Sequence, residues 1–461
     1  MLGAQMRALL TIVALAAVAF DPATGLAQAP TPAPSEPAAQ ASQPPAPKPA
    51  PPSVAGRVLT LDEAIAIALD TQPNIQARLS DFAAAQFRVD QALSPLLPQI
   101  AGTWNAARAQ NVTGSPGTSL GTAVTRTRTF WTDTTLARIT GSQLLFDFGK
   151  TLAATDVARR NADISLEDVE LQRQLITLAV KEAYTNINFA QRLIKVNQQA
   201  LERADLNLRS ARGFFEVGTR PKSDVTRAEV DVANARLGVI QARNAERIAR
   251  VALNVAMGIA ADTPTQVQDN LQFQPVGFER PRLLAEALRQ RPEYKQEKLK
   301  VDAAQAFVRQ TFRNFFPDIT AGGFYGAQRA DMNEVWELNL GLTWSIFDGG
   351  NRIARYREAR AAYDAAQARV KAKELDISRE VEQTQLSLAE TEERIQAAQA
   401  LVASAQENFR LAQGRFDAGV GTILELTDAQ LALTQAQNTE AQALADYRIA
   451  LARLERALGR R

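Results

Sequence analysis

The chain of 461 residues contains neither cysteine nor histidine. Without cysteine it can form no disulfide, offers no thiol nucleophile and has no N-terminal cysteine to which a lipid could be attached. Without histidine, general acid–base catalysis would require convergent carboxylates, tyrosines or lysines, and none stand out from the solvated faces of the predicted helices. The sequence therefore indicates that the protein is not an enzyme, and it predicts no catalytic residue, metal site or cofactor.

An excess of charge of one sign is also missing, because 52 Lys and Arg residues are balanced by 50 Asp and Glu residues. The two signs are interspersed, so the broad basic surface that binds nucleic acid is absent. Beyond the N-terminal segment there is no uninterrupted apolar run of about 18 residues, which argues against a transmembrane helix. If such a chain enters a membrane, it does so as a β-barrel.

The N-terminus has the regions of a secretory signal peptide. Arg7 is followed by an apolar run over residues 8–20 and then by small residues. We predict a signal peptide over residues 1–27, cleaved before Gln28, so the chain is exported. Residues 28–57 are rich in proline and alanine and hold almost no large apolar side chain, which predicts a flexible linker.

The clearest positive feature is an internal duplication. The motif Phe-Asp-Phe-Gly at 146–149 recurs as Phe-Asp-Gly-Gly at 347–350, and Phe-Glu-Val-Gly at 215–218 recurs as Phe-Asp-Ala-Gly at 416–419. Both pairs are offset by 201 residues, whereas matching prolines further upstream are offset by 219. The sequence therefore predicts two copies of one unit, with an 18-residue insertion in the first copy ahead of its Phe-Asp-Phe-Gly motif.

Each copy is predicted to contain short helices, a β-hairpin and a long helical hairpin. Proline and glycine mark the ends of these elements, and the long stretches between them are rich in Ala, Gln, Glu, Arg and Leu. The polar, glycine-containing segment 111–125 is expected to be a loop at the tip of the first β-hairpin. The predicted boundaries are a first copy over 58–260, with its hairpins near 98–147 and at 150–258, and a second copy over 261–461, with its hairpins near 317–347 and at 350–459.

Apolar and polar residues alternate from Trp336 to Ile346, which predicts a strand with one apolar face. The pattern suits either a soluble sheet with one wet face or a transmembrane strand. Trp336 and Trp344 are separated by about 26 Å along such a strand, close to the height of the apolar band of an outer-membrane barrel. All four tryptophans lie in the two β-hairpin segments, which predicts an aromatic girdle; the alternative is a soluble sheet core. They are Trp104, Trp131, Trp336 and Trp344.

The predicted strands also require an oligomer. Two hairpins supply four strands per chain, whereas bacterial outer-membrane barrels have at least about eight. A single chain therefore leaves sheet edges open, and either two or three chains could close them.

Three duplicated motifs together carry a family resemblance. They are Leu-Asp-Glu-Ala at 61–64, Phe-Asp-x-Gly where strand meets helix, and Val-Gly followed after five residues by Asp at the far turn. Over about residues 58–460 the chain resembles the TolC-like outer-membrane efflux and secretion channels. The resemblance implies a mixed fold, in which a homotrimer forms a 12-stranded transmembrane β-barrel in the outer membrane, continuous with an α-helical barrel in the periplasm.

The same resemblance implies a function and partners. The protein would be the exit duct of a tripartite efflux pump or a type I secretion system, conducting substrates passively. Its partners would be a periplasmic adaptor, an inner-membrane RND pump or ABC exporter, and outer-membrane lipid. The competing hypothesis is a periplasmic adaptor or a structural coiled-coil protein of the cell envelope, which would lack the strand pairs and the duplication.

By resemblance, the pore constriction falls on carboxylates six and nine residues after Gly419, here Glu425 and Asp428. Three copies of each would form two acidic rings that concentrate cations and repel anions. The simpler alternative is that both acids stabilise the start of a helix through its macrodipole.

The family also latches its closed state by tying an acid of the first copy, here Asp224, to an aromatic hydroxyl and an arginine of the second. This sequence departs from that pattern, because Phe416 stands at the hydroxyl position and Gly421 at the arginine position. Arg220 could pair with an acid instead. The turns at Gly218 and Thr219, and at Gly419 and Val420, are the expected docking sites of the adaptor.

Overall fold

The computed structural model describes residues 56–119, 122–275, 280–328 and 333–460. They belong to one compact unit, Pro51–Arg461. The predicted signal peptide and most of the predicted linker lie outside the described residues.

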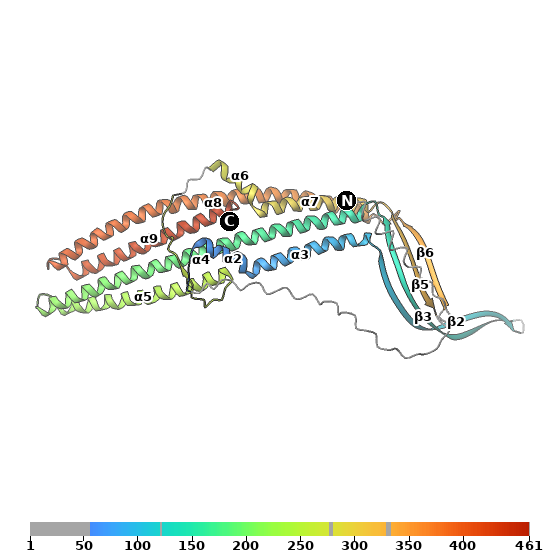
Figure 1. The fold of residues 1–461 in the computed structure, drawn as a ribbon, viewed down its shortest axis with the longest axis horizontal. Coiled ribbons are helices and arrows are strands. Elements are labelled where there is room, and N and C mark those ends of the chain that lie inside the picture. Colours follow the sequence, from blue (N-terminus) through green and yellow to red (C-terminus); the bar gives the residue numbers. More distant parts are fainter. Residues whose placement is uncertain (1–55, 120–121, 276–279, 329–332, 461) are drawn as a thin grey trace, which may run out of the picture. The chain divides into compact units, whose positions relative to one another are not determined.

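The elements follow one another in the same order in both halves of the chain (Figure 1). The first half contains β1 (Val58–Leu59), α2 (Leu61–Thr71), α3 (Pro73–Leu93), the 3-10 turn η2 (Ser94–Leu96), β2 (Gln99–Ser119), β3 (Thr122–Phe146), α4 (Lys150–Glu216) and α5 (Lys222–Met257). The second half contains β4 (Gln266–Val267), α6 (Arg280–Gln290), α7 (Pro292–Arg313), β5 (Asp318–Gln328), β6 (Asn333–Thr343), α8 (Asn351–Asp417) and α9 (Ile423–Ala457).

The long helices α4 and α8 have 67 residues each and begin at the duplicated Phe-Asp motif. In the first copy the Asp147 carboxylate accepts hydrogen bonds from the amides of Gly149 (2.8 Å) and Thr151 (2.6 Å). Burial would raise the pKa of Asp147, but hydrogen bonds from Thr151 and the backbone amides hold it below its usual value. The motif therefore caps the long helix directly after the sheet.

Replacing Asp147 by alanine is expected to lower the free energy of unfolding by about 1–2 kcal/mol, because two amides at the start of α4 lose their acceptor. Asp147→Asn keeps one acceptor oxygen and should lose less. Thermal unfolding followed by circular dichroism would compare the two variants. Equal midpoints for the alanine variant and the unaltered protein would contradict the capping role.

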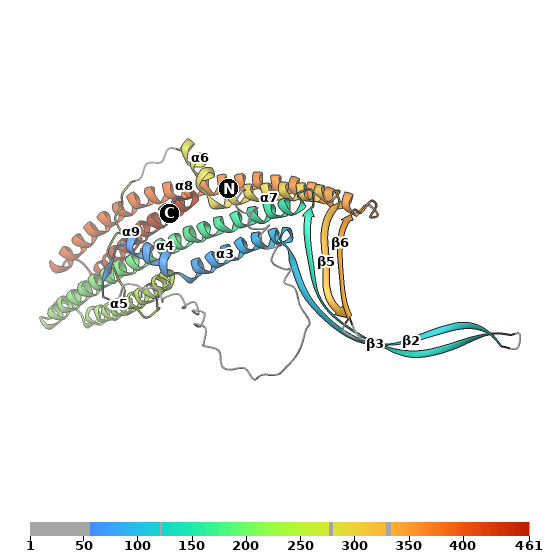
Figure 2. The same cartoon turned by 45° about the vertical axis from the view of Figure 1, so that its right-hand side comes forward.

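Four helices lie side by side in a layer, in the order α3, α4, α7, α8 (Figure 2). The return helices α5 and α9 pack along α4 and α8, and α9 also contacts α4. Small residues dominate the buried positions of α4, which lets neighbouring helices approach closely. Because α4 and α8 are single helices of about 100 Å, their first turns lie next to the sheet and their last turns lie far from it. In the part of the chain that the structure describes, no helix is long and apolar enough to cross a bilayer.

The sheet is antiparallel with the order β2-β3-β5-β6, so the two copies meet where β3 pairs with β5. Its second hairpin is shorter than the sequence predicts, since β6 ends at Thr343 rather than near Phe347. The reason is that β5 begins only at Asp318, after Pro317, which has no amide hydrogen to donate to a ladder. Trp344 and Ile346 therefore follow the strand instead of belonging to it.

The first hairpin is longer than predicted, and the expected loop over residues 111–125 is wrong. β2 and β3 pair continuously from Gln99 and Ser142 to Ser119 and Thr122. The insertion therefore extends both strands, and threonine, which favours extended backbone, is frequent along β3. Residues 122–135 of β3 pair only with residues 106–119 of β2. These two segments, which we call the ribbon, extend beyond the four-stranded sheet (Figure 2).

The strand register gives the sheet two unlike faces, because directly paired residues share a side. One face is apolar, and its Leu338 and Leu340 are 81% and 73% exposed. The polar face carries Thr103, Asn105, Arg138, Thr140, Glu337 and Asn339. The apolar sheet face carries Ile100, Trp104, Ile139, Ile319, Tyr325, Trp336, Leu338, Leu340 and Leu342.

Candidate functional site

Two exposed turns close the helical hairpins at the end far from the sheet. Gly218 and Gly419 adopt positive φ angles of 74° and 78°, a conformation that disfavours every side chain. The amide and hydroxyl of Thr219 both donate to the carbonyl of Phe214, at 3.0 and 2.8 Å. In the second turn, the amide of Val420 donates to the carbonyl of Arg415 at 3.0 Å. Both turns thus have a defined backbone geometry.

Arg220 ties the first turn to the second. Its Nη2 donates to the carbonyl of Gly421 at 2.6 Å, and its guanidinium lies 4.5 Å from the centre of the buried Phe416 ring. Its Nη1 is 3.6 Å from the Asp224 carboxylate, one helical turn away. Phe214 packs edge-on against Phe416, with ring centres 5.7 Å apart. Arg220 therefore contacts Asp224, Phe416 and Gly421, which are the three positions that the family resemblance assigns to the latch.

Glu425 and Asp428 both lie on the exposed surface of α9, close to its start. Being three residues apart, they share one side of the helix. Thr422 caps the helix by accepting from the Glu425 amide at 3.2 Å, and the Glu425 carboxylate is 3.6 Å from exposed Arg415. An exposed pair of this kind contributes about 0–1 kcal/mol, so it leaves the carboxylate available to solvent. Glu425 occupies the first turn, as the macrodipole alternative requires, whereas Asp428 lies one turn later.

Three tryptophans mark the two ends of the apolar sheet face. Trp104 and Trp336 lie within two residue rows of each other at the end far from the helices. Trp344 lies at the helix end, where its indole nitrogen donates to the carbonyl of Phe315 at 3.1 Å. Between these ends the sheet presents the apolar band that a girdle would border.

Trp131 differs from the other three, because it lies on the ribbon, opposite Gln110. It is six rows beyond the row of Trp104, or about 20 Å along the strands. Trp131 is on the same side of the strands as the apolar sheet face, but its surroundings on the ribbon are polar. Arg108 pairs with Asp133 at 3.3 Å and lies over the Trp131 ring. The register thus separates Trp131 from a girdle formed by the other three.

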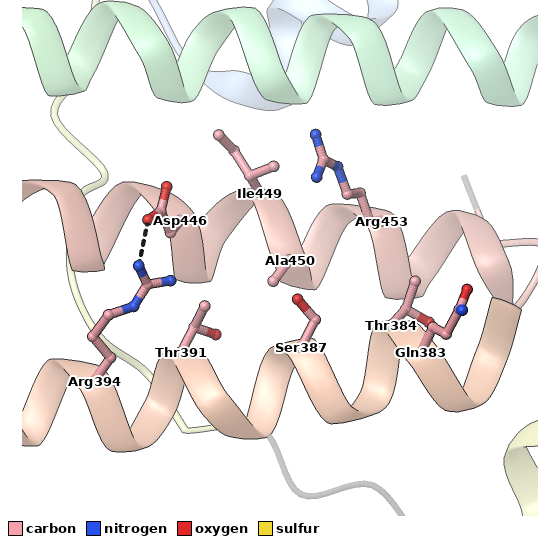
Figure 3. A pocket seen from close by; sticks show the side chains of 9 residues that line it. All are labelled: Gln383, Thr384, Ser387, Thr391, Arg394, Asp446, Ile449, Ala450 and Arg453. Atoms are coloured by element: carbon pink, nitrogen blue, oxygen red, sulfur yellow. Dashed lines mark ion pairs between the residues drawn. The ribbon is translucent and has the colours of Figure 1, made fainter.

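A polar pocket of about 410 Å³ lies between α8 and α9 (Figure 3). Its acid is already engaged, as the Asp446 carboxylate is 3.1 Å from Arg394, and its second arginine, Arg453, donates to Glu182 of α4 at 2.8 Å. The described residues hold no cluster of three carboxylates that would suit a metal ion. The pocket is lined by Gln383, Thr384, Ser387, Thr391, Arg394, Asp446, Ile449, Ala450 and Arg453, and offers polar surface rather than a nucleophile with its base.

The comparison with known families is decisive. The sequence model described as outer membrane efflux protein matches residues 64–259 and 283–460, one stretch in each copy. The chain belongs to the outer membrane efflux protein family. This membership excludes the adaptor and coiled-coil hypotheses.

Individual members of the family are distant relatives. The cobalt-zinc-cadmium resistance protein CzcC of Cupriavidus metallidurans is 27% identical over 68% of this chain and 74% of its own length. The outer membrane protein TolC of Escherichia coli is 24% identical over 84% of this chain and 80% of its own. Matched relatives are covered over 61% to 85% of their lengths.

Solved structures agree on the fold. The outer membrane protein VceC of Vibrio cholerae superposes with a TM-score of 0.69 at 18% identity, over 87% of this chain and 96% of that one. The fold is thus that of the TolC-like channels, a long helical domain joined to a β domain.

As a member of the outer membrane efflux protein family, the protein is an outer-membrane exit channel of a tripartite efflux system, with its helices in the periplasm. Channels of this family are passive, so the protein is not an enzyme. An adaptor and an inner-membrane transporter complete such systems.

Two features of the site were missed by the sequence prediction. The sequence suggests that Arg220 pairs with an acid, and it does pair with Asp224 at 3.6 Å. Its contacts with Phe416 and Gly421 could not be predicted, because they depend on two turns about 200 residues apart. The sequence prediction also missed a row of aromatic rings between the sheet and α7, formed by Phe146, Phe148, Phe316 and Phe312. Its signal is the three phenylalanines in the short stretch 312–316.

Proposed function

We propose that three copies of this chain assemble into one conduit, with a closed barrel of twelve strands in the outer membrane. The proposal rests on the apolar sheet face, where Leu338, Leu340 and Leu342 of the regularly alternating strand β6 are exposed. A surface of that kind is stable against lipid and unstable against water. Three chains with four strands each supply twelve strands, an even number within the range of bacterial outer-membrane barrels.

Open edges support assembly from several copies. In the described part of the chain, β2 and β6 each have one strand neighbour, and α3 and α8 end the helical layer. Pairing β2 of one copy with β6 of the next would remove both free edges of the sheet.

Uncovered apolar side chains on the long helices support the same assembly. They recur at helical spacing on the sides of α5 and α8 that no other described element covers, and a second copy would cover them. They are Val230, Leu237, Ile240, Ile248, Val251 and Val255 on α5, and Leu375, Leu386, Leu401 and Leu411 on α8.

In this conduit, Glu425 and Asp428 form two acidic rings near the periplasmic end. Their exposure and common side on α9 support this position. Arg220 replaces the family latch, holding the two turns of one copy together through Phe416 and Gly421. A ring of carboxylates in a narrow passage favours cations over anions.

The turns at Gly218 and Thr219 and at Gly419 and Val420 dock the adaptor, and an RND pump or an ABC exporter supplies the substrate from the inner membrane. Relatives named for metal resistance and for toluene efflux are similarly distant from this chain, at 27% and 25% identity. Substrate choice therefore belongs to the transporter rather than to a binding site in the conduit.

The pair Leu340→Arg and Asn339→Arg tests the membrane assignment, because the two positions are adjacent on β6 and face opposite sides of the sheet. Arginine on the lipid side near the bilayer centre costs about 2–4 kcal/mol per copy, whereas arginine on the lumen side is tolerated. We expect Leu340→Arg to abolish insertion into planar bilayers and Asn339→Arg to retain it.

Cross-linking of the unaltered protein in detergent should give a limiting species of three chains. Equal insertion by the two arginine variants would show that the apolar sheet face does not contact lipid. A limiting species of two chains would reject the twelve-stranded barrel.

A further inference from the structure

A row of aromatic rings leads from the sheet to the space between α7 and α8. It starts at Phe146, the last residue of β3, which pairs with a residue of the apolar sheet face. Consecutive ring centres are 4.8 Å apart from Phe146 to Phe148, 5.3 Å to Phe316, 5.9 Å to Phe312 and 6.1 Å to Tyr356. The four phenylalanines remain 39% to 52% exposed, so the row forms a surface and not a core.

The row ends in a groove of about 400 Å³ between the end of α7 and the start of α8. This volume is in the range of small-molecule sites. Trp344, which marks the helix end of the apolar sheet face, bonds to the carbonyl of one of its residues, Phe315. The groove is lined by Phe312, Phe315, Ile353, Tyr356, Arg357 and Arg360.

The groove is basic as well as aromatic. The first ten residues of α8, 351–360, contain four arginines and a single acid, Glu358. Arg352 is paired with Asp348 at 2.9 Å. Arg357 and Arg360 are exposed and form no ion pair with any other residue that the structure describes. The Arg360 guanidinium lies 5.9 Å from the centre of the Tyr356 ring. Two guanidinium groups without a carboxylate partner among the described residues therefore stand at the end of the aromatic row.

The shared fold does not require this groove. At the offsets of the duplication, Phe312 corresponds to Leu93, Tyr356 to Thr155 and Arg357 to Asp156. The first copy builds the same junction of sheet and helices without the rings of Phe312 and Tyr356 and with an acid in place of Arg357, whereas it keeps an arginine, Arg159, at the position of Arg360. The rings and Arg357 of the second copy thus serve something other than the fold.

We propose that this groove binds one anionic phospholipid from the periplasmic leaflet of the outer membrane. Arg357 and Arg360 hold its phosphate, since guanidinium groups recognise phosphate through paired, charge-assisted hydrogen bonds. Its acyl chains lie along the aromatic row toward the apolar sheet face. Basic pockets at the membrane surface bind anionic headgroups in this way.

Charge complementarity favours a lipid over a second copy of the chain. A protein surface covering the groove would bury two arginines that have no carboxylate partner among the described residues, which is costly. An anionic headgroup neutralises them instead. The assignment rests on the outer-membrane location of the sheet but not on the acidic rings.

Native mass spectrometry of the detergent-purified full-length protein tests the proposal, with dioleoylphosphatidylglycerol compared with dioleoylphosphatidylcholine. The two lipids have the same acyl chains and differ in net charge. We expect the anionic lipid to bind at least about tenfold more tightly, because the quaternary ammonium of phosphatidylcholine offsets the charge of its phosphate and is repelled by the two guanidinium groups. The variant Arg357→Gln plus Arg360→Gln should lose this preference.

The matched control is Arg355→Gln plus Arg369→Gln, which removes the same charge from exposed positions of α8 outside the groove. It should keep the preference. Phe312→Ala should weaken binding of both lipids, and glycerol phosphate, which has no acyl chain, should bind far more weakly than either. Equal affinity for the two lipids, or equal losses in the groove and control variants, would overturn the proposal. Because binding is read in detergent, these outcomes leave conduction by the channel untouched.

Discussion

Replacing Glu425 and Asp428 together by alanine should raise the single-channel conductance and reduce cation selectivity, by on the order of tenfold in the ratio of cation to anion permeability. In the proposed assembly of three chains, two rings of three carboxylates would concentrate cations in a narrow passage and would also reduce its width. Removing them lowers the electrostatic barrier to anions and widens the passage. The measurement is conductance and reversal potential of the purified protein in planar bilayers under a salt gradient.

Two further variants separate charge from size. Glu425→Gln plus Asp428→Asn keeps the side-chain volume, so selectivity should fall while conductance changes less than in the alanine variant. Glu407→Ala plus Asp417→Ala removes two exposed acids from α8 near the same turn and should leave selectivity unchanged. If the alanine variant of Glu425 and Asp428 conducts as the unaltered protein does, the protein remains a channel but its constriction lies elsewhere.

Arg220→Ala is expected to separate the two turns of each copy and to increase the resting conductance. The side chain makes a charged hydrogen bond to Gly421, which contributes about 1.5–3 kcal/mol, and a cation–π contact with Phe416, which contributes about 1–2 kcal/mol. Arg220→Lys keeps the charge without the planar guanidinium and should have an intermediate effect.

Spin labels can follow this separation without a background signal, because the chain has no cysteine of its own. Cysteines introduced at Thr219 and Val420 place one label on each exposed turn. The distance distribution should broaden and lengthen in Arg220→Ala and stay narrow in Arg227→Ala, which alters an exposed arginine of α5. An unchanged distribution in Arg220→Ala would show that packing of Phe214 and Phe416 alone holds the turns.

The helices could be predicted closely because local stereochemistry decides where they begin and end. Pro73 and Pro292 occupy the first turn of α3 and α7, and Gly149 and Gly350 adopt positive φ just before α4 and α8. Proline fixes the backbone φ angle and glycine allows positive φ angles, whatever the surrounding sequence. Their positions in the sequence therefore translate directly into element boundaries.

The strands and the contacts between turns could not be predicted in the same way, because they depend on distant partners. Gly, Ser and Thr in residues 111–125 have the composition of a loop, yet in-register pairing of β2 with β3 makes them strand. The position of Arg220 likewise depends on how two helical hairpins pack. Phe416, which the sequence marks only as a lost hydroxyl, becomes the surface on which that arginine lies.

The strand pairing of the ribbon restricts how its length can change during evolution or engineering. The ribbon forms the outer part of the first hairpin, whose strands β2 and β3 have 21 and 25 residues, against 11 in each strand of the second hairpin. Removing two residues from each strand at the tip would leave every remaining side chain on its present side. Removing one residue from a single strand would invert the sides of everything beyond it. Balanced changes thus lengthen or trim this projection by steps of about 7 Å while the sheet below keeps its register.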